Sequence, residues 1–356
     1  MSLSVGIVGF PNVGKSTLFQ TITKKQVDIS NYPFCTIEPN VGVVAVPDER
    51  VDKLAELMNA ENKIYAPIKF VDIAGLIKGS HKGEGLGNKF LAEIRETDAI
   101  IYILRAFSKE NIPSVLGKVN PLEEKEVLDT ELIMKDLETV EKRIEHLEKE
   151  AKRGIKEITE ELEIFKKTKK LLEEGKVLLE EPLEEEEKLI LKNYQLLTIK
   201  PRLYLLNGKE KEVSSEVLNV FKKNNWPFLI IDLLEEFEAV GLTKEERITL
   251  GLPARDELDL LIKEAYKLLN LITFFTILKP NEVRAWTLKK GEKVLEAAEK
   301  IHSDFKKNFI CAEIINWKDL IETGGLQNAK EKGVIRTEGK EYIVQDGDVI
   351  IIKHSA

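Results

Sequence analysis

The sequence predicts an α/β protein with a mostly parallel sheet, an inserted antiparallel coiled-coil hairpin and a smaller α+β unit at the carboxyl end. Three observations predict this class. Short apolar runs alternate with helical patterns up to residue 107, a long stretch of purely helical spacing follows, and strand-like runs return towards the carboxyl end. The 356 residues are enough for two or three domains of about 150 residues each.

The first apolar run, Val5–Val8, leads directly into a phosphate-binding motif. Residues 9–16 read Gly-Phe-Pro-Asn-Val-Gly-Lys-Ser, a complete G-x-x-x-x-G-K-S pattern, and a helical pattern opens at Ser16. In this context backbone N–H groups surround the β-phosphate, Lys15 adds positive charge at the β- and γ-phosphates, and the Ser16 hydroxyl binds Mg²⁺. The motif predicts a nucleoside triphosphate site.

Two further segments complete the predicted metal site. Asp72, at the end of the strand-like run 68–72, begins an Asp-x-x-Gly element. Its carboxylate is expected to hold Mg²⁺ through water, and the Gly75 amide to contact the γ-phosphate. Thr36, in the polar loop 31–40, is expected to supply a second hydroxyl to Mg²⁺. The other elements predicted before residue 107 are strands at 41–46 and 99–104 and helices at 50–58 and 90–95.

The groups that align the attacking water are the least defined part of the site. Leu76 stands where many GTPases place a glutamine, and its side chain cannot hydrogen-bond water, so slow turnover is expected. His81 could position or deprotonate water, although most loop histidines are simply solvated. Asn12 could coordinate K⁺ beside the phosphates or could serve only as a turn residue. The candidate catalytic residues are Lys15, Gly75 and His81.

From residue 132 apolar residues recur at three- and four-residue steps with charged residues between them. The pattern breaks at Arg153-Gly154 and then resumes. Two amphipathic helices with one turn predict an antiparallel coiled-coil hairpin, and two ordinary surface helices are the alternative. The apolar series is Ile133, Leu137, Val140, Ile144, Leu147, Ala151, Ile158, Leu162, Phe165 and Leu172.

Strand-like runs return at 202–206 and 227–232, so the hairpin is predicted to be an insertion in the nucleotide domain. The first run is followed by Asn207-Gly208-Lys209-Glu210, a departure from the guanine-reading N-K-x-D pattern. The Glu210 carboxylate is one methylene too long to match the paired donors of guanine, and a mispaired buried group costs about 1–3 kcal/mol. The sequence therefore favours ATP over GTP.

A predicted helix at 255–269 leads to the carboxyl-terminal unit, with strands expected at 274–278, 285–288, 342–344 and 349–352 around a helix at 294–305. Residues 120–200 hold 16 basic and 23 acidic side chains, whereas residues 270–356 hold 14 and 13. The carboxyl-terminal unit is therefore free to contact RNA phosphates, with scattered solvated lysines as the alternative. The residues that could form this basic face are Lys279, Arg284, Lys289, Lys290, Lys293, Lys306 and Lys307.

The composition excludes several classes of protein. A net charge of −8 argues against a general polyanion binder, and two cysteines are too few for a disulfide framework. No apolar run approaches the roughly 18 residues of a membrane span, and no leader precedes the first strand. We therefore expect a cytoplasmic, monomeric protein without a membrane partner.

Together these motifs resemble the YchF/Obg-like ATPase family, a branch of the TRAFAC-class P-loop NTPases. The resemblance implies a Ras-like, OBG-type nucleotide domain over residues 1–272, interrupted by the hairpin at 122–197, and a ubiquitin-like TGS domain over residues 273–354. It also implies ATP hydrolysis and association with the ribosome or a ribosomal subunit. The segments that carry it are the loop with Asn12, residues 31–40, Asp72–Leu76, Lys82–Gly87, Asn207–Glu210, Val283–Thr287, Ala329–Gly333 and Asp346–Asp348.

The resemblance also assigns roles to residues. It implies that the backbone of Asn207 and Gly208, next to Glu210, contacts adenine and that Ser16 and Thr36 bind Mg²⁺. Three places depart from the family pattern: Gly208 stands where a bulkier apolar residue is common, the loop Asp232–Glu235 lacks the small residues often found there, and Ser114 stands about where relatives often carry a histidine. The expected function is a slow Mg²⁺-dependent ATPase switch; an Obg-type GTPase and a nucleotide-gated ribosome-binding module with negligible turnover are the alternatives. The implied ATP-binding run is Asn12, Val13, Gly14, Lys15, Ser16 and Thr17.

Overall fold

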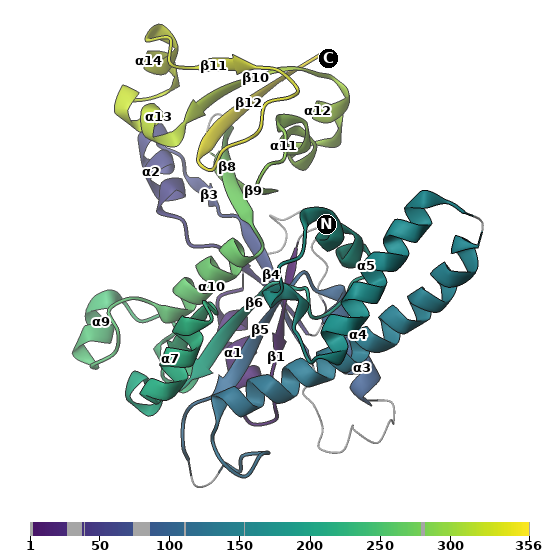
Figure 1. Cartoon of the computed structure of the whole chain (residues 1–356). Coiled ribbons are helices and arrows are strands. Elements are labelled where there is room, and N and C mark those ends of the chain that lie inside the picture. The colour runs from purple at the N-terminus through teal and green to yellow at the C-terminus, as the bar shows by residue number, and fades with distance from the viewer. Residues whose placement is uncertain are drawn as a thin grey trace.

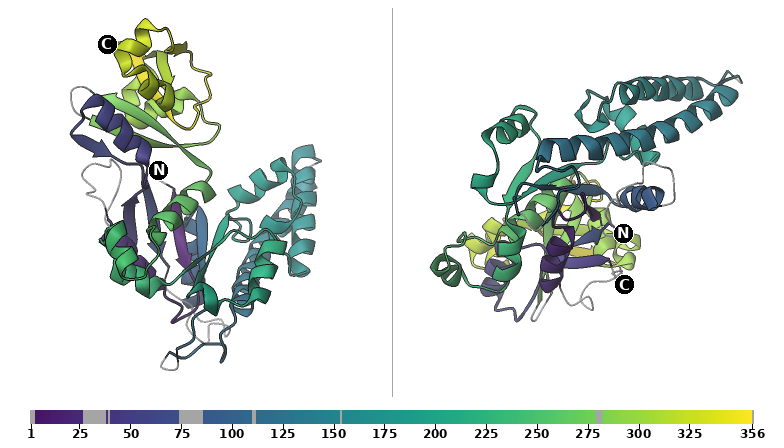
Figure 2. Two further views of the ribbon diagram at one scale, coloured as in Figure 1. Left: turned by 90° about the vertical axis from the view of Figure 1, so that its left-hand side faces the viewer. Right: turned by 90° about the horizontal axis from the view of Figure 1, so that it is seen from below.

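The computed structural model contains two six-stranded sheets and a long helical arm (Figure 1). It describes residues 3–26, 38, 40–73, 86–109, 112–152, 154–278 and 282–355. The arm and the carboxyl-terminal sheet leave the first sheet in different directions, which the two views of Figure 2 show. Within the described residues, no helix combines the length and the apolar character that crossing a membrane requires.

The first sheet has the order β2-β4-β1-β5-β6-β7, and every neighbouring pair is parallel except β2 and β4. This confirms the predicted mostly parallel α/β fold. The neighbouring strands β5 and β6 are buried at every residue, because helices cover both faces of such a sheet, and they therefore read as continuous apolar runs. The strands are β1 (Ser4–Val8), β2 (Val41–Ala45), β4 (Pro67–Asp72), β5 (Ala99–Arg105), β6 (Arg202–Asn207) and β7 (Phe228–Ile231).

Up to β5 the helices of this domain alternate with the strands as the sequence predicted, whereas the helix Ser215–Lys223 between β6 and β7 was not predicted. The helix after the first loop, α1, packs on β1, β2 and β4 and also contacts α8. Two short helices between β7 and α10 were not predicted; they are joined by a buried ion pair between Arg247 and Glu236. The helices are α1 (Lys15–Lys24), α3 (Leu86–Glu96), α7 (Ser215–Lys223), α8 (Leu233–Ala239), α9 (Lys244–Thr249) and α10 (Glu257–Leu268).

The arm is inserted between β5 and β6. Its two long helices are α4 (Pro121–Ala151) and α5 (Lys156–Glu173), and α5 runs back along α4 (Figure 1). The 3-10 turn η3 (Leu178–Glu180) and helix α6 (Glu185–Asn193) complete it. Its apolar core is separate from that of the sheet and includes Val140, Phe165 and Leu172. At its root the buried Asp136 carboxylate accepts both backbone N–H groups of Leu197 and Thr198, at 2.8 Å each.

The second sheet has the order β11-β10-β12-β8-β9-β3. Two sequence predictions were wrong here: residues 342–344 contribute only one bridge, Lys293 to Ile343, and the predicted helix 294–305 is divided at the extended residue His302. Strand β10 was not predicted. The elements are β8 (Leu271–Leu278), β9 (Glu282–Lys289), α11 (Val294–Ile301), α12 (Ser303–Lys307), β10 (Phe309–Asn316), α13 (Trp317–Thr323), α14 (Leu326–Glu331), β11 (Arg336–Glu338) and β12 (Asp348–His354).

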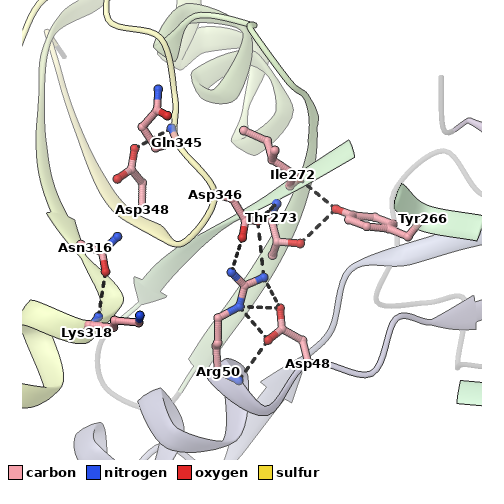
Figure 3. A network of polar contacts seen from close by, with 10 residues as sticks. All are labelled: Asp48, Arg50, Tyr266, Ile272, Thr273, Asn316, Lys318, Gln345, Asp346 and Asp348. Carbon is pink, nitrogen blue, oxygen red and sulfur yellow. Dashed lines mark hydrogen bonds and ion pairs between the residues drawn. The ribbon is translucent and has the colours of Figure 1, made fainter. Parts of the chain in front are cut away.

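One edge strand of this second sheet, β3 (Asn62–Ile64), belongs to the connection between β2 and β4 of the first domain. It pairs in parallel with β9, from Asn62 opposite Glu282 to Ile64 opposite Arg284. The same connection holds α2 (Glu49–Met58), whose Arg50 binds both Asp48 and Asp346 (Figure 3). The two domains are therefore joined by a shared sheet edge as well as by the chain after α10.

Candidate nucleotide-binding site

The phosphate-binding motif forms the loop between β1 and α1. Asn12 and Gly14 both have left-handed backbone conformations, with φ of 65° and 110°. A Cβ at Gly9 would lie 2.6 Å from the carbonyl oxygen of Ile103, and one at Gly14 would collide with the side chain of Asn207. Glycine is therefore required at both motif positions, because the backbone turns tightly against β5 and β6.

Lys15 is buried and folded over the loop. Its Nζ donates to the carbonyls of Gly9 (2.9 Å) and Phe10 (2.8 Å). Burial lowers the pKa of Lys15 to about 8, and the carboxylates of Asp72 and Glu124 oppose this change. The helix that Lys15 opens has no acidic residue in its first turn and no side-chain cap, so its N-terminal amides are available to an anion.

The predicted metal ligands lie at the same edge of the sheet. Ser16 is exposed in the first turn of α1, and Asp72 ends β4 directly beside Ile7 of β1. Burial raises the pKa of Asp72, whereas the charge of Lys15 lowers it. Within the described ranges no group of three or more His, Cys, Asp or Glu side chains could hold a metal ion. Thr36, Gly75, Leu76 and His81 lie outside the described residues.

A hydroxyl and a carboxylate oxygen are hard donors, and they suit Mg²⁺. This ion is commonly held by one or two protein ligands together with substrate phosphates and water. The chemistry of Ser16 and Asp72 therefore fits Mg²⁺ better than a metal that requires its own cage of side chains.

Asn207, at the end of β6, joins three parts of the site. Its Nδ2 donates to the carbonyl of Val13 (2.7 Å) and its Oδ1 accepts the N–H of Leu233 (3.1 Å). Its own carbonyl accepts the N–H groups of Ala106 (2.9 Å) and Phe107 (3.0 Å). The predicted base-reading residue therefore also fixes the phosphate loop and the segment after β5.

The three residues after Asn207 form a compact turn. Gly208 has φ of 153°, and a Cβ there would lie 3.0 Å from the backbone nitrogen of Phe107. Glu210 is exposed and begins the 3-10 turn η4 (Glu210–Glu212). The carboxylate of Glu212, which no motif singled out, accepts the N–H of Lys209 at 2.7 Å. Lys209 also pairs through Nζ with Glu235.

Sequence reasoning missed Glu124 and Arg105. Glu124 lies in the first turn of α4 and is only 2% exposed, and its Oε2 accepts the N–H of Arg105 at 2.8 Å. Burial raises the pKa of Glu124 to about 7, opposed by the Arg105 N–H and by the charges of Arg105 and Lys15. No sequence signal distinguishes it from Glu123, because acidic residues in a first helical turn are common.

The site therefore has the arrangement expected of a ligand pocket in an open α/β sheet. The phosphate loop follows β1, Asp72 ends β4, Arg105 ends β5 and Asn207 ends β6. Carboxyl ends of neighbouring parallel strands meet at one edge, where such sheets bind their ligands.

Comparisons with known proteins agree with this geometry. A family model described as "50S ribosome-binding GTPase" matches residues 4–153, and the model YchF-GTPase_C, described as a protein of unknown function, matches residues 271–355. The protein described as "Ribosome-binding ATPase YchF" from Bacillus subtilis is 47% identical, with 98% of each chain covered. The protein of the same description from Escherichia coli O157:H7 is 45% identical, again over 98% of each chain.

A solved structure extends the similarity to three dimensions. The YchF GTPase of Schizosaccharomyces pombe superimposes with a TM-score of 0.88 at 36% identity, covering 99% of this chain and 98% of that one. Because these relatives match over nearly their whole length at such identity, the chain belongs to the YchF family of P-loop nucleoside triphosphatases.

Proposed function

We propose that this protein is a slow, Mg²⁺-dependent ATPase that acts as a nucleotide-controlled switch on the ribosome. The observation that carries the proposal is the buried Lys15, which two loop carbonyls hold in the phosphate loop beside the uncapped start of α1. A buried ammonium and free helix amides form an anion site. ATP hydrolysis and the ribosome as partner are supported by relatives that are described as ribosome-binding ATPases.

The base preference is supported by the turn after β6. Both polar atoms of the Asn207 side chain are hydrogen-bonded within the protein, to Val13 and to Leu233. The turn η4 has glutamate at position 210, where guanine-binding proteins have aspartate. A site whose donors and acceptors do not match guanine loses affinity for it. We propose that the backbone of Asn207 and Gly208 contacts adenine and that ATP binds at least tenfold more tightly than GTP, which is about 1.4 kcal/mol.

Mg²⁺ would be held by the Ser16 hydroxyl, by Thr36 and, through water, by Asp72. When bound, the ion neutralises charge on the β- and γ-phosphates. Lys15 would orient the same oxygens, and the backbone of Val13 and Gly14 would surround the β-phosphate. K⁺ beside Asn12 would add a further positive charge.

The rate of hydrolysis is expected to be low. Leu76 in the position of a water-orienting glutamine supports basal turnover well below once per second. The γ-phosphate contact of Gly75 and a role for His81 in aligning water remain proposals about residues outside the described ranges.

The carboxyl-terminal unit is our candidate for the RNA contact. Among the proposed cations that the structure describes, Lys293 is paired with Glu341 and Lys306 with Glu299, whereas Lys279 lies outside the described residues. Lys289 and Lys290, which are exposed at the end of β9, are therefore the better test of this face. We propose a nucleotide domain over residues 1–272, interrupted by the insertion 122–197, and a TGS domain over residues 273–354. We also propose that the protein is monomeric and cytoplasmic.

Two measurements test the proposal. Calorimetric titration should give tighter binding of ATP than of GTP, and equal or better GTP affinity would identify an Obg-type GTPase instead. Single-turnover hydrolysis with and without ribosomes, with Lys15→Ala as the inactive reference, separates a switching ATPase from a module that only binds nucleotide. Charge reversal at Lys289 and Lys290 should weaken ribosome binding and reduce its dependence on salt.

A further inference from the structure

Glu124 is a buried carboxylate at the root of the arm, and the function proposed above gives it no role. Its neighbour Glu123 has a side chain that is 37% exposed and pairs with Lys118. A carboxylate in the first helical turn benefits from the helix dipole even when exposed, whereas burial adds a large desolvation cost. The helix start alone therefore does not explain why Glu124 faces inward.

The carboxylate holds the last residue of β5. Glu124 Oε2 accepts the backbone N–H of Arg105 at 2.8 Å. The buried Arg105 side chain in turn donates from Nε to the carbonyl of Phe107 (3.1 Å) and from Nη2 to that of Ile112 (2.8 Å). The arm root therefore fixes the residue that organises the loop after β5.

The same segment is held from the other side by the base-reading element. The carbonyl of Asn207 accepts the N–H groups of Ala106 and Phe107, and its side chain binds Val13 in the phosphate loop. Two hydrogen bonds therefore connect the segment that Glu124 holds to Asn207.

Glu124 also contributes charge around Lys15 in the phosphate loop. The charged groups of neighbouring elements that act on it are Lys15 of α1 and Arg105 of β5, and Asp72 of β4 acts on the same lysine. A triphosphate seated at Lys15 brings negative charge into this region. An ionised Glu124 opposes that binding, and a protonated one does not.

We propose that Glu124 is a positioning residue for ATP hydrolysis, through which the root of the arm sets both the geometry of the loop after β5 and the charge around Lys15. The proposal rests on the ATPase activity proposed above. Because α4 extends into the projecting arm, a partner that tilts the arm would act on the phosphate loop through this carboxylate.

Three variants of the full-length protein separate the two effects. Glu124→Gln keeps an oxygen that can accept the Arg105 N–H but removes the charge. Glu124→Ala removes both, and Glu123→Gln is the matched control in the same helical turn. At pH 6, where the Glu124 carboxyl is mostly protonated, we expect kcat to fall about tenfold in Glu124→Ala with little change in KM, to be restored to within about twofold in Glu124→Gln, and to be unchanged in Glu123→Gln.

The charge effect is measured by ATP affinity as a function of pH. Wild type and Glu124→Gln should bind ATP equally at pH 6, whereas at pH 7.5, above the pKa of Glu124 but below that of Lys15, the variant should bind about two- to threefold more tightly. Wild-type kcat in Glu124→Ala, a kcat in Glu124→Gln as low as that in Glu124→Ala, or an affinity ratio that does not change with pH would each overturn the proposal. If Glu124→Ala does not fold, the affinity ratio decides. Failure of the wild type to hydrolyse ATP would refute the ATPase function but leave that ratio measurable.

Discussion

Arg50 of α2 and Asp346 of the carboxyl-terminal domain are 296 positions apart in the sequence and form an ion pair of 2.6 Å. The Asp346 carboxylate also accepts the N–H of Thr273 in β8 at 2.8 Å (Figure 3). Arg50 is anchored on its other side by Asp48, so one guanidinium connects the start of α2, through Asp346, to strand β8 of the second sheet. The position of this pair makes it a measurable link between the domains.

A double-mutant cycle with Arg50→Ala and Asp346→Ala should give a coupling free energy of about 1 kcal/mol, because the pair is charge-assisted but Asp346 has a side chain that is 51% exposed. Denaturant unfolding measures this energy, and faster hydrogen exchange in β3 and β9 would locate it. The pair Lys293–Glu341, which lies within one domain, is the control. Strictly additive effects of the two substitutions would show that the pair does not hold the domains together.

Asn207→Ala should weaken ATP binding by about ten- to a hundredfold, because it leaves the Val13 carbonyl and the Leu233 N–H unpaired in a buried site. Asn207→Asp tests the hydrogen bond to Val13 more sharply. The side chain keeps its size, but an oxygen replaces the Nδ2 donor and faces the Val13 carbonyl. Calorimetry with ATP and ADP should therefore give similar losses for both variants. An Asp variant with wild-type affinity would contradict the assigned contacts.

Asn12 offers a test of the K⁺ proposal that separates the side chain from the turn. Its φ of 65° means that Asn12→Ala strains the backbone, whereas Asn12→Gly keeps this conformation and removes only the side chain. If the amide holds K⁺, the wild type should hydrolyse ATP faster in K⁺ than in Na⁺ at equal ionic strength, and Asn12→Gly should abolish the difference. Equal wild-type rates in the two salts would remove the cation role.

The buried Glu124 should also make the stability of the nucleotide-free protein depend on pH. Its pKa is raised from 4.5 to about 7, so the folded state binds more protons than the unfolded state between these values. Its contribution to stability is therefore greatest at low pH and decreases as the pH rises from about 4.5 to 7, by an amount on the order of 3 kcal/mol. The melting temperature of Glu124→Gln relative to wild type should thus be higher at pH 8 than at pH 5. A difference independent of pH would mean that Glu124 does not titrate in this way.

The elements that the sequence predicted correctly are those marked by a motif or by a periodicity within a short stretch of chain. Such a motif or periodicity marks the phosphate loop, β5, β6 and the two arm helices. The structure has these elements where the sequence predicted them. Strand β3 could not be found in this way, because its three residues Asn62–Ile64 pair with a partner some 220 positions away. A segment that short has no period of its own.

Two further errors have the same origin. Residues 342–344 have the composition of a strand, but the Tyr342 hydroxyl binds the buried Asp348 carboxylate (2.8 Å), and the chain turns before β12. Glu124 reads as an ordinary acidic helix start, and only the position of Arg105 at the end of β5 shows that it is part of the site. Tertiary contacts, which the sequence does not display, decided both cases.

The strand β3 has a consequence for how this protein can be divided. The family match at residues 271–355 suggests a separable piece, yet that piece contains β9 without the strand that covers its outer edge. An isolated fragment would present the unpaired N–H and C=O groups of β9 to solvent, a surface on which extended chains add to one another. We therefore expect the fragment to self-associate when expressed alone, and to remain monodisperse only when residues 46–66 are supplied with it.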